Sequence, residues 1–283
     1  GIDLLCKDIS LPLGEQGGAI VEVNAGPGLL MHIKPGVGKP RPVGQAVVDN
    51  LFAAGETGRI PLVGVTGTRG KTAVARLVAH LIYLSGKQGG LACSDGLFLG
   101  RRQVQQADAA TWAAGHRLLL NRALQAAVIE NGARTILGEG LAYDRCSVGI
   151  VTNIQPEKEE LARWDVQPTG GEYYTTHRST YRTQVDVILP SGYAVLNAAD
   201  PMVADLADLC DGQVIFFAAD PHCPALAAHR AAGKRVVTVI ESRIALCAGA
   251  DELRLCRLGD VPAIGKSKKP EDIANVLAGV AAG

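Results

Sequence analysis

The chain has 283 residues with 28 basic and 28 acidic side chains, so its formal net charge is zero and neither nucleic acid nor an anionic membrane is indicated as its main partner. Its seven cysteines are odd in number and form no Cys-x-x-Cys pair, which argues against a disulfide framework or a zinc site and favours reduced thiols in the cytoplasm. No apolar run reaches the ~18 residues of a membrane span, and the length predicts about two domains.

The first predicted elements form a separate N-terminal module. Residues 18–24 alternate as a strand, and Glu22 and Asn24 lie two positions apart, so both face the same side. Their carboxylate and amide oxygens suit Mg²⁺ bound beside nucleotide phosphates, while an edge strand with two solvated polar residues is the alternative. A loop rich in proline and glycine and a short helix over residues 43–52 lead to a domain boundary. The expected domains are residues 1–56 and 57–283.

The stretch around which the chain is organised is a glycine loop between a strand and a helix. Residues 60–66 form a short apolar run typical of a buried parallel strand, and the loop Gly-Thr-Arg-Gly-Lys-Thr follows as residues 67–72. Glycines let backbone N–H groups turn toward a phosphate, a helix N-terminus adds partial positive charge, and lysine and threonine reach the terminal phosphates and Mg²⁺. The general pattern places a glycine where Val65 stands, so the loop is a shorter variant and an ordinary strand-to-helix turn is the alternative. The predicted nucleotide-binding residues are Thr66, Gly67, Thr68, Arg69, Gly70, Lys71 and Thr72.

Three later strands end in polar side chains, which a parallel sheet gathers at one edge, facing the ligand crevice. Strand 90–93 leads to Asp95, a candidate nucleotide-binding residue for which plain turn chemistry is the alternative. Strand 126–130 ends in Glu130, which is either an Mg²⁺ ligand or a turn or capping carboxylate. The next strand carries Asn153 close to its end, and we expect this residue to bind the nucleotide as well.

After Asn153 the regular pattern is interrupted and then resumes. Residues 155–177 are polar and predict a surface excursion or a partly ordered loop, and a basic loop at 266–269 is expected to be solvated surface. The further predicted elements are strands 185–189, 193–197, 214–217 and 235–240, helices 201–210, 225–232 and 270–282, and antiparallel edge strands 243–248 and 252–258. This order predicts an α/β fold with a mostly parallel sheet flanked by helices.

Four stretches of the chain occur in an order that is known from one protein family. They are Gly18-Ala-Ile-Val-Glu-Val-Asn-Ala-Gly-Pro-Gly28, Arg59-Ile-Pro-Leu-Val-Gly-Val-Thr-Gly-Thr-Arg-Gly-Lys-Thr72, Val151-Thr-Asn-Ile154 and Gly192-Tyr-Ala-Val-Leu-Asn-Ala-Ala-Asp-Pro201. In these motifs the chain resembles the cyanophycin synthetase family. The resemblance implies a Mur-ligase-like central domain with a P-loop, preceded by the C-terminal piece of an ATP-grasp domain. It also implies that the chain is part of a longer polypeptide.

The resemblance implies an ATP-dependent ligase that assembles aspartate and arginine into the polymer cyanophycin. ATP phosphorylates a carboxylate, and an amine then displaces the phosphate. By position, Glu22 and Asn24 would hold Mg²⁺ in the ATP-grasp half, and Thr72 and Glu130 would hold it in the Mur-like half. Lys71 and Glu130 are the implied catalytic residues, with ATP and Mg²⁺ as cofactors. A cytoplasmic homo-oligomer acting on small-molecule or polymer substrates is expected.

The chain also departs from the family pattern. Arg69 stands where the family has asparagine, and Ala73 where it has a second threonine. Gln155-Pro-Glu-Lys158 replaces Asp-His-Leu-Gly, so a histidine metal ligand is missing, and Tyr181 stands where a lysine is expected. We therefore expect an impaired arginine-adding half, because lost ligands remove transition-state contacts. The alternative is a non-catalytic Mur-like module that supports or oligomerises an ATP-grasp domain, which would polymerise aspartyl-arginine dipeptides.

Overall fold

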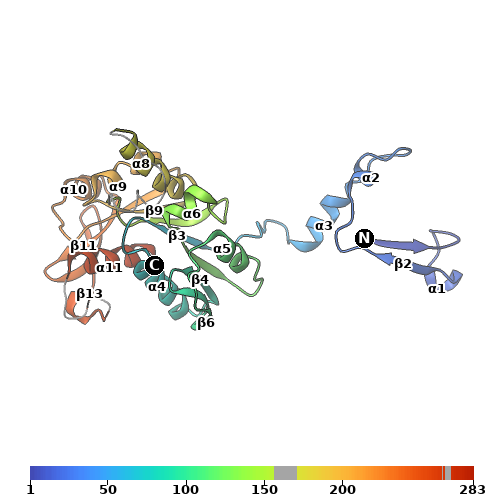
Figure 1. Cartoon of the computed structure of the whole chain (residues 1–283), viewed down its shortest axis with the longest axis horizontal. Coiled ribbons are helices and arrows are strands. Elements are labelled where there is room, and N and C mark those ends of the chain that lie inside the picture. The colour runs from blue at the N-terminus through green and yellow to red at the C-terminus, as the bar shows by residue number, and fades with distance from the viewer. Residues whose placement is uncertain (156–170, 263, 265–268) are drawn as a thin grey trace. The chain divides into compact units, whose positions relative to one another are not determined.

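The computed structural model describes residues 1–155, 171–262, 264 and 269–283. The chain divides into two compact units, unit 1 at Gly1–Arg59 and unit 2 at Ile60–Gly283 (Figure 1). The polar excursion expected after Gln155 and the basic loop expected at 266–269 fall largely outside the described residues.

Unit 1 consists of one antiparallel strand pair and three short helices. Its elements are β1 (Ile2–Leu5), α1 (Leu13–Gln16), β2 (Ala19–Val23), α2 (Leu30–Ile33) and α3 (Val43–Leu51), and β1 pairs with β2. The strand predicted over 18–24 and the helix predicted over 43–52 correspond to β2 and α3. Every residue of unit 1 is exposed or half-buried, so this unit has no buried core of its own.

Unit 2 is built on an eleven-stranded sheet in the order β13-β12-β11-β10-β9-β8-β3-β7-β4-β5-β6. The strands are β3 (Leu62–Thr66), β4 (Gly89–Cys93), β5 (Gly96–Leu99), β6 (Arg102–Gln105), β7 (Ala126–Glu130), β8 (Cys146–Val151), β9 (Ile188–Asn197), β10 (Gln213–Phe217), β11 (Arg235–Ile240), β12 (Arg243–Ala248) and β13 (Asp251–Arg257). The neighbours from β4 to β11 are parallel, and β5-β6 and β12-β13 complete the two edges in antiparallel fashion. This topology confirms the predicted α/β fold with a mostly parallel sheet.

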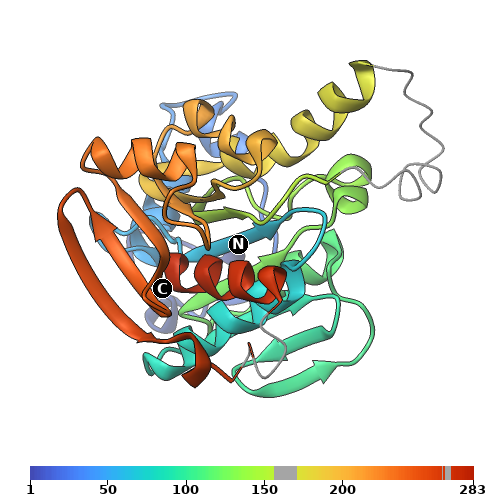
Figure 2. The same ribbon diagram turned by 90° about the vertical axis from the view of Figure 1, so that its left-hand side faces the viewer.

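Helices cover both faces of the sheet, as the buried strands require. On one face lie α4 (Lys71–Leu84) and α11 (Pro270–Ala282), which pack against each other and bury Val74, Val78, Val276 and Leu277 (Figure 2). The other helices in the described part of unit 2 are α5 (Trp112–Leu119), α6 (Ala133–Gly138), α8 (Gly171–Asp186), α9 (Pro201–Ala204), α10 (Pro224–Ala231) and the 3-10 turns Ala207–Leu209 and Leu258–Asp260. Among them α5, α8, α9 and α10 place buried side chains in the core of the opposite face.

The segment before β9 differs from the sequence prediction. It forms α8, where a loop to residue 177 and a strand from residue 185 were expected. The predicted strand 185–189 begins too early: Ile188 and Leu189 lie in β9, but Val185 and Asp186 still belong to α8. Tyr181 and Val185 lie four residues apart on one helix face, and both are only 1 % exposed. The helical spacing of these buried side chains therefore decides the structure at Val185, although residues 185–189 are rich in β-branched residues that favour a strand.

Smaller differences concern the ends and lengths of elements. β9 is one continuous strand where two segments were predicted, and residues 201–210 form α9 and a separate 3-10 turn instead of one helix. The β5-β6 hairpin was not predicted; it turns at Gly100, which has a φ of +57°. In the part of the chain that the structure describes, no helix is both long enough and apolar enough to cross a membrane.

Candidate functional site

The glycine loop joins β3 to α4, and the structure favours glycine at two of its positions. Gly67 has a φ of +135° and Gly70 a φ of +80°, both in the region that favours glycine. A Cβ atom at Gly67 would overlap with Oγ1 of Thr152, and one at Gly70 would overlap with Oδ1 of Asn275 on α11. Backbone conformation and close packing thus both favour glycine at these two positions, just before α4 begins.

The N-terminus of α4 is open to an anion. Its N-cap is Gly70, which has no side chain to bond the first N–H groups, and its first turn contains no acidic residue. Free N–H groups and the helix dipole at such an end attract phosphate and carboxylate groups. Lys71 is half-buried beside this end, and its Nζ donates a hydrogen bond to the carbonyl of Thr68 at 3.1 Å. The ammonium group is therefore held at the loop.

Glu130, the last residue of β7, lies at the same helix end. The residue is 1 % exposed, and its carboxylate accepts hydrogen bonds from Oγ1 of Thr72 at 3.1 Å and from Oγ and N–H of Ser94 at 3.0 Å and 2.9 Å. A buried carboxylate needs such donors, because burial without partners is costly. The structure thus brings Thr72 and Glu130, the two metal ligands predicted for this half, into direct contact.

The donor chemistry at Thr72 and Glu130 fits Mg²⁺, which prefers hard oxygen ligands. No cluster of three or more His, Cys, Asp or Glu side chains suited to a metal occurs among the described residues. A cation held by Thr72 and Glu130 would therefore take its other ligands from phosphate oxygens and water, as Mg²⁺ commonly does. Burial raises the pKa of the nearby Cys93 thiol to about 11, so this group stays neutral and adds no second negative charge.

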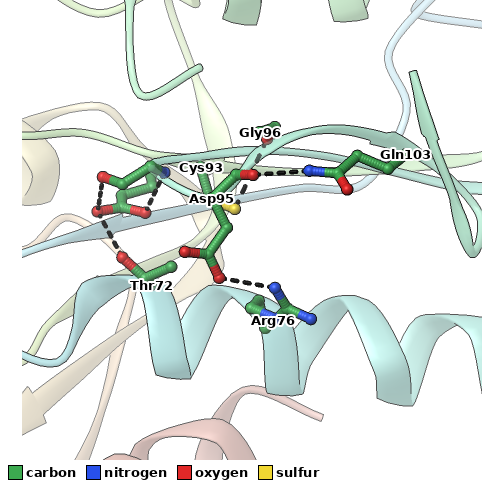
Figure 3. Close-up of polar contacts among 8 residues, drawn as sticks. Thr72, Arg76, Cys93, Asp95, Gly96 and Gln103 are labelled. Carbon is green, nitrogen blue, oxygen red and sulfur yellow. Dashed lines mark hydrogen bonds and ion pairs between the residues drawn. The ribbon is translucent and has the colours of Figure 1, made fainter. Parts of the chain in front are cut away.

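Asp95 lies at the end of β4, where the sequence placed it, and faces α4 (Figure 3). Its carboxylate forms an ion pair with Arg76 at 2.6 Å, and both side chains are about half exposed. Its carbonyl accepts a hydrogen bond from Nε2 of Gln103 at 2.8 Å. Exposed ion pairs of this kind are weak and easily broken. Because the Asp95 side chain is also half exposed, a ligand can still reach it.

The other predicted nucleotide-binding residues make hydrogen bonds within the loop region. Oγ1 of Thr66 donates to a carbonyl just after β7 at 2.8 Å, and Oγ1 of Thr68 accepts the N–H of Gln155 at 3.0 Å. Asn153 contacts the peptide of Arg69 twice: Oδ1 accepts its N–H and Nδ2 donates to its carbonyl, each at 3.0 Å. These side chains support the loop conformation.

The remaining pair of predicted metal ligands belongs to unit 1. Glu22 lies in β2 and Asn24 follows this strand, and both are exposed. Asp3 of β1 stands directly opposite Glu22 in the strand register, so its side chain shares a face with Glu22. Sequence reasoning missed Asp3 because β1 is too short to show an alternating pattern.

Sequence reasoning also missed two residues of unit 2 that touch the site, Ser94 and Asn275, and gave no contact for a third, Tyr181. Ser94 directly follows β4, and a hydroxyl at the end of a parallel strand is a signal that could have identified it. Tyr181 is buried, and its hydroxyl lies 3.5 Å from Oγ1 of Thr68. Asn275 reaches Gly70 from the last helix, and its sequence carries no local sign of this contact.

Comparison with known proteins shows extensive similarity to one group of enzymes. No protein-family model matches the chain. The chain is 38 % identical over 280 residues to cyanophycin synthetase of Synechocystis sp. and 34 % identical over 278 residues to that of Geminocystis herdmanii. Each match covers 98 % of this chain but only 31 % of the relative, so the chain spans about a third of the length of these curated relatives. The resemblance inferred from the four motifs is thereby confirmed.

More distant similarities concern the Mur ligases. The chain is 26 % identical over 258 residues to UDP-N-acetylmuramoylalanine--D-glutamate ligase of Symbiobacterium thermophilum. This match covers 90 % of this chain and 48 % of that protein. A solved structure of UDP-N-acetylmuramoyl-L-alanyl-D-glutamate--2,6-diaminopimelate ligase superimposes with a TM-score of 0.54 at 14 % identity, over 78 % of this chain and 43 % of that one. At this identity the likeness concerns the fold alone, and it confirms the predicted Mur-ligase-like fold.

Proposed function

We propose that the chain is part of an ATP-dependent ligase of the cyanophycin synthetase type, which joins a carboxylate to an amine. One observation carries the proposal: the glycine loop opens α4 with Lys71 and Thr72, and the buried carboxylate of Glu130 lies 3.1 Å from the Thr72 hydroxyl. An open helix N-terminus, a lysine and a pair of hard oxygen donors suit a nucleoside triphosphate bound with Mg²⁺. Many kinds of protein bind nucleotides, and the similarity to cyanophycin synthetases supports the choice of a ligase.

In this proposal the chemistry at the loop is phosphoryl transfer to a carboxylate. The N–H groups at the start of α4 and Lys71 would bind the phosphates of ATP, and Thr72 and Glu130 would hold Mg²⁺, which neutralises phosphate charge when bound. A carboxylate oxygen of the substrate attacks the γ-phosphorus, the bond to the bridging oxygen breaks, and ADP leaves. The amine of the second substrate then attacks the acyl carbon, loses a proton, and inorganic phosphate leaves. The contribution of Lys71 is to stabilise the negative charge that develops on the transferred group.

We propose that unit 1 is the C-terminal piece of an ATP-grasp domain. The resemblance of residues 18–28 supports this assignment, and so does the burial pattern, because every residue of unit 1 is exposed or half-buried. Such a segment needs further protein to cover its apolar side chains. Its exposed carboxylates Asp3 and Glu22, together with Asn24, would hold the Mg²⁺ of a second ATP site.

The arginine-adding activity of the Mur-like half is proposed to be impaired. The family resemblance expects a lysine at the position of Tyr181, and the structure has a buried phenol there, 3.5 Å from Thr68. A neutral buried group replaces a positive charge near the phosphates, which weakens electrostatic stabilisation of the transition state. The parent protein would then polymerise preformed aspartyl-arginine dipeptides at its ATP-grasp site.

A polymerisation assay tests the proposed impairment. The full-length parent protein is given ATP, Mg²⁺ and a primer, with either aspartyl-arginine dipeptide or free aspartate and arginine. The expected result is incorporation of the dipeptide and little or no incorporation of free arginine. Efficient incorporation of free radiolabelled arginine would sink the idea, because that reaction requires a working Mur-like site.

The second candidate function is a non-catalytic module that supports the ATP-grasp domain. The observation that favours it is the same Tyr181, which fills space at the loop with a group that has no role in phosphoryl transfer. Such a module would keep the fold but would not bind a nucleotide.

Calorimetric titration with ATP and Mg²⁺ separates the two candidates. The ligase proposal expects binding heat with the wild-type chain and an affinity about ten- to a hundred-fold lower for Lys71→Ala, because charge-assisted hydrogen bonds to phosphate are lost. Lys87→Ala is the matched control, since Lys87 is an exposed lysine after the other end of α4. Absence of binding heat in all three proteins would favour the non-catalytic module.

A further inference from the structure

We infer that the four residues after β8 (Thr152–Gln155), termed here the β8 extension, hold the glycine loop in its binding conformation, with Asn153 as the positioning residue. The inference rests on the proposed function only where it concerns the nucleotide. The contacts that carry it lie entirely within unit 2, between the β8 extension and the loop.

The side chain of Asn153 forms hydrogen bonds with both the backbone N–H and the backbone carbonyl of Arg69 in the loop. Its Oδ1 accepts the N–H of Arg69 and its Nδ2 donates to the carbonyl of Arg69, each at 3.0 Å. The hydroxyl of Thr152 donates to the same carbonyl at 2.6 Å. Of the neutral side chains, only a primary amide offers a donor and an acceptor in this arrangement, so Asn153 has a geometric reason to be an asparagine.

Main-chain bonds extend this contact along the loop. The N–H of Thr152 donates to the carbonyl of Thr66 at 3.0 Å, and the N–H of Thr68 donates to the carbonyl of Asn153 at 3.0 Å. The N–H of Gln155 then donates to Oγ1 of Thr68 at 3.0 Å. Thr66, Thr68 and Arg69 are therefore all hydrogen-bonded to the β8 extension, much as one strand is bonded to its neighbour.

These bonds divide the loop into two parts with different roles. The N–H of Arg69 is used by Asn153, so a phosphate would be met by the free N–H groups of the first turn of α4. Asn153 thus acts on a ligand through the loop backbone and not by contact. Because a loop that is already ordered loses less entropy on binding, the β8 extension raises affinity by preorganisation.

Hydrogen exchange tests the structural part of the inference without any nucleotide. In the 283-residue wild-type chain, the amides of Thr68 and Arg69 should exchange slowly, and Asn153→Ala should speed exchange at Arg69 by at least about ten-fold. Asn197→Ala is the matched control: Nδ2 of Asn197 donates to the carbonyl of Thr152 at 2.8 Å and Oδ1 accepts the N–H of Ala199, so neither bond involves residues 67–70. Equal exchange rates at Arg69 in wild type and Asn153→Ala would overturn the inference.

Nucleotide affinity tests the functional part. If two neutral hydrogen bonds order the loop, Asn153→Ala should weaken binding of ATP with Mg²⁺ by about five- to a hundred-fold, and Asn197→Ala by less than about two-fold. A wild-type affinity that Asn153→Ala leaves unchanged would contradict the positioning role. If wild type itself binds no ATP, the proposed function fails, while the exchange result still decides whether Asn153 orders the loop.

A second variant guards against loss of folding in Asn153→Ala. Asn153→Asp keeps an acceptor for the Arg69 N–H but places a carboxylate oxygen against the Arg69 carbonyl. It should therefore show exchange at Arg69 that is faster than wild type at pH 7, where the carboxylate is charged. Wild-type exchange in this folded variant would also count against the inference.

Discussion

Glu130 shows at the level of one residue why this site calls for a cation. Its carboxylate is almost fully buried and receives three neutral hydrogen bonds. No ion pair found among the described residues involves Glu130. A buried negative charge with only neutral donors is poorly compensated, and a bound divalent cation would supply the missing charge.

Gly70 is the residue whose substitution reports most directly on the loop conformation. Gly70→Ala would introduce a side chain at a φ of +80° and into the Oδ1 atom of Asn275. Gly86→Ala is the matched control, because Gly86 has nearly the same φ, +79°, and a Cβ added there would meet no atom within 4 Å. We expect Gly86→Ala to lower the free energy of unfolding by about 1–2 kcal/mol, and Gly70→Ala to lower it by about 1–3 kcal/mol more, because of overpacking.

Chemical denaturation of both variants checks this prediction. Equal losses of stability in the two variants would show that Asn275 does not pack against the loop. The double variant Gly70→Ala with Asn275→Ala should recover most of the extra loss, since the overlapping atom is then removed.

At the level of elements, local patterns identified the loop but not what surrounds it. The strand, the glycines and the start of α4 lie within 60–84 and follow from periodicity and glycine conformation alone. Glu130 and Asn153 could also be predicted, because parallel strands bring their ends to one edge. Tyr181 and Asn275 reach the loop from α8 and α11, and such contacts depend on tertiary packing that no local pattern encodes.

The error at α8 has a specific physical origin. The helix presents Tyr181, Gln184 and Val185 to the sheet, and Gln184 is completely buried. Its Oε1 accepts hydrogen bonds from Nδ2 of Asn131 at 3.0 Å and from the hydroxyl of Tyr143 at 2.8 Å. A buried glutamine interrupts the apolar stripe by which a helix is recognised in a sequence. For this reason the sequence pattern did not predict α8.

This network predicts a clear effect on stability. Gln184→Leu leaves the amide of Asn131 and the hydroxyl of Tyr143 without this acceptor inside the protein. The free energy of unfolding should fall by about 1–3 kcal/mol. Arg182→Ala on the same helix removes only an exposed ion pair with Asp186, and it should cost less than about 1 kcal/mol. Denaturant unfolding that gives Gln184→Leu the smaller loss would contradict the assigned role of the network.

At the scale of the whole molecule, the chain offers two places where a metal–nucleotide complex could bind. Unit 2 has a buried core on both faces of its sheet. The candidate binding residues around its glycine loop come from the ends of β4, β7 and β8 and from the first turn of α4. Unit 1 presents Glu22, Asn24 and Asp3 on an exposed strand pair without a buried core. We therefore expect unit 2 to bind first and more tightly in this chain.

The central claim, a metal–nucleotide site at the glycine loop, is tested most directly by locating the metal. Crystals of the 283-residue chain grown with a non-hydrolysable ATP analogue and Mn²⁺, which replaces Mg²⁺, give an anomalous signal at the manganese edge. The account predicts one strong peak within about 2.5 Å of both Oγ1 of Thr72 and the carboxylate of Glu130, with the phosphates at the first turn of α4. A peak only at other residues, or a bound analogue without manganese at Glu130, would contradict it.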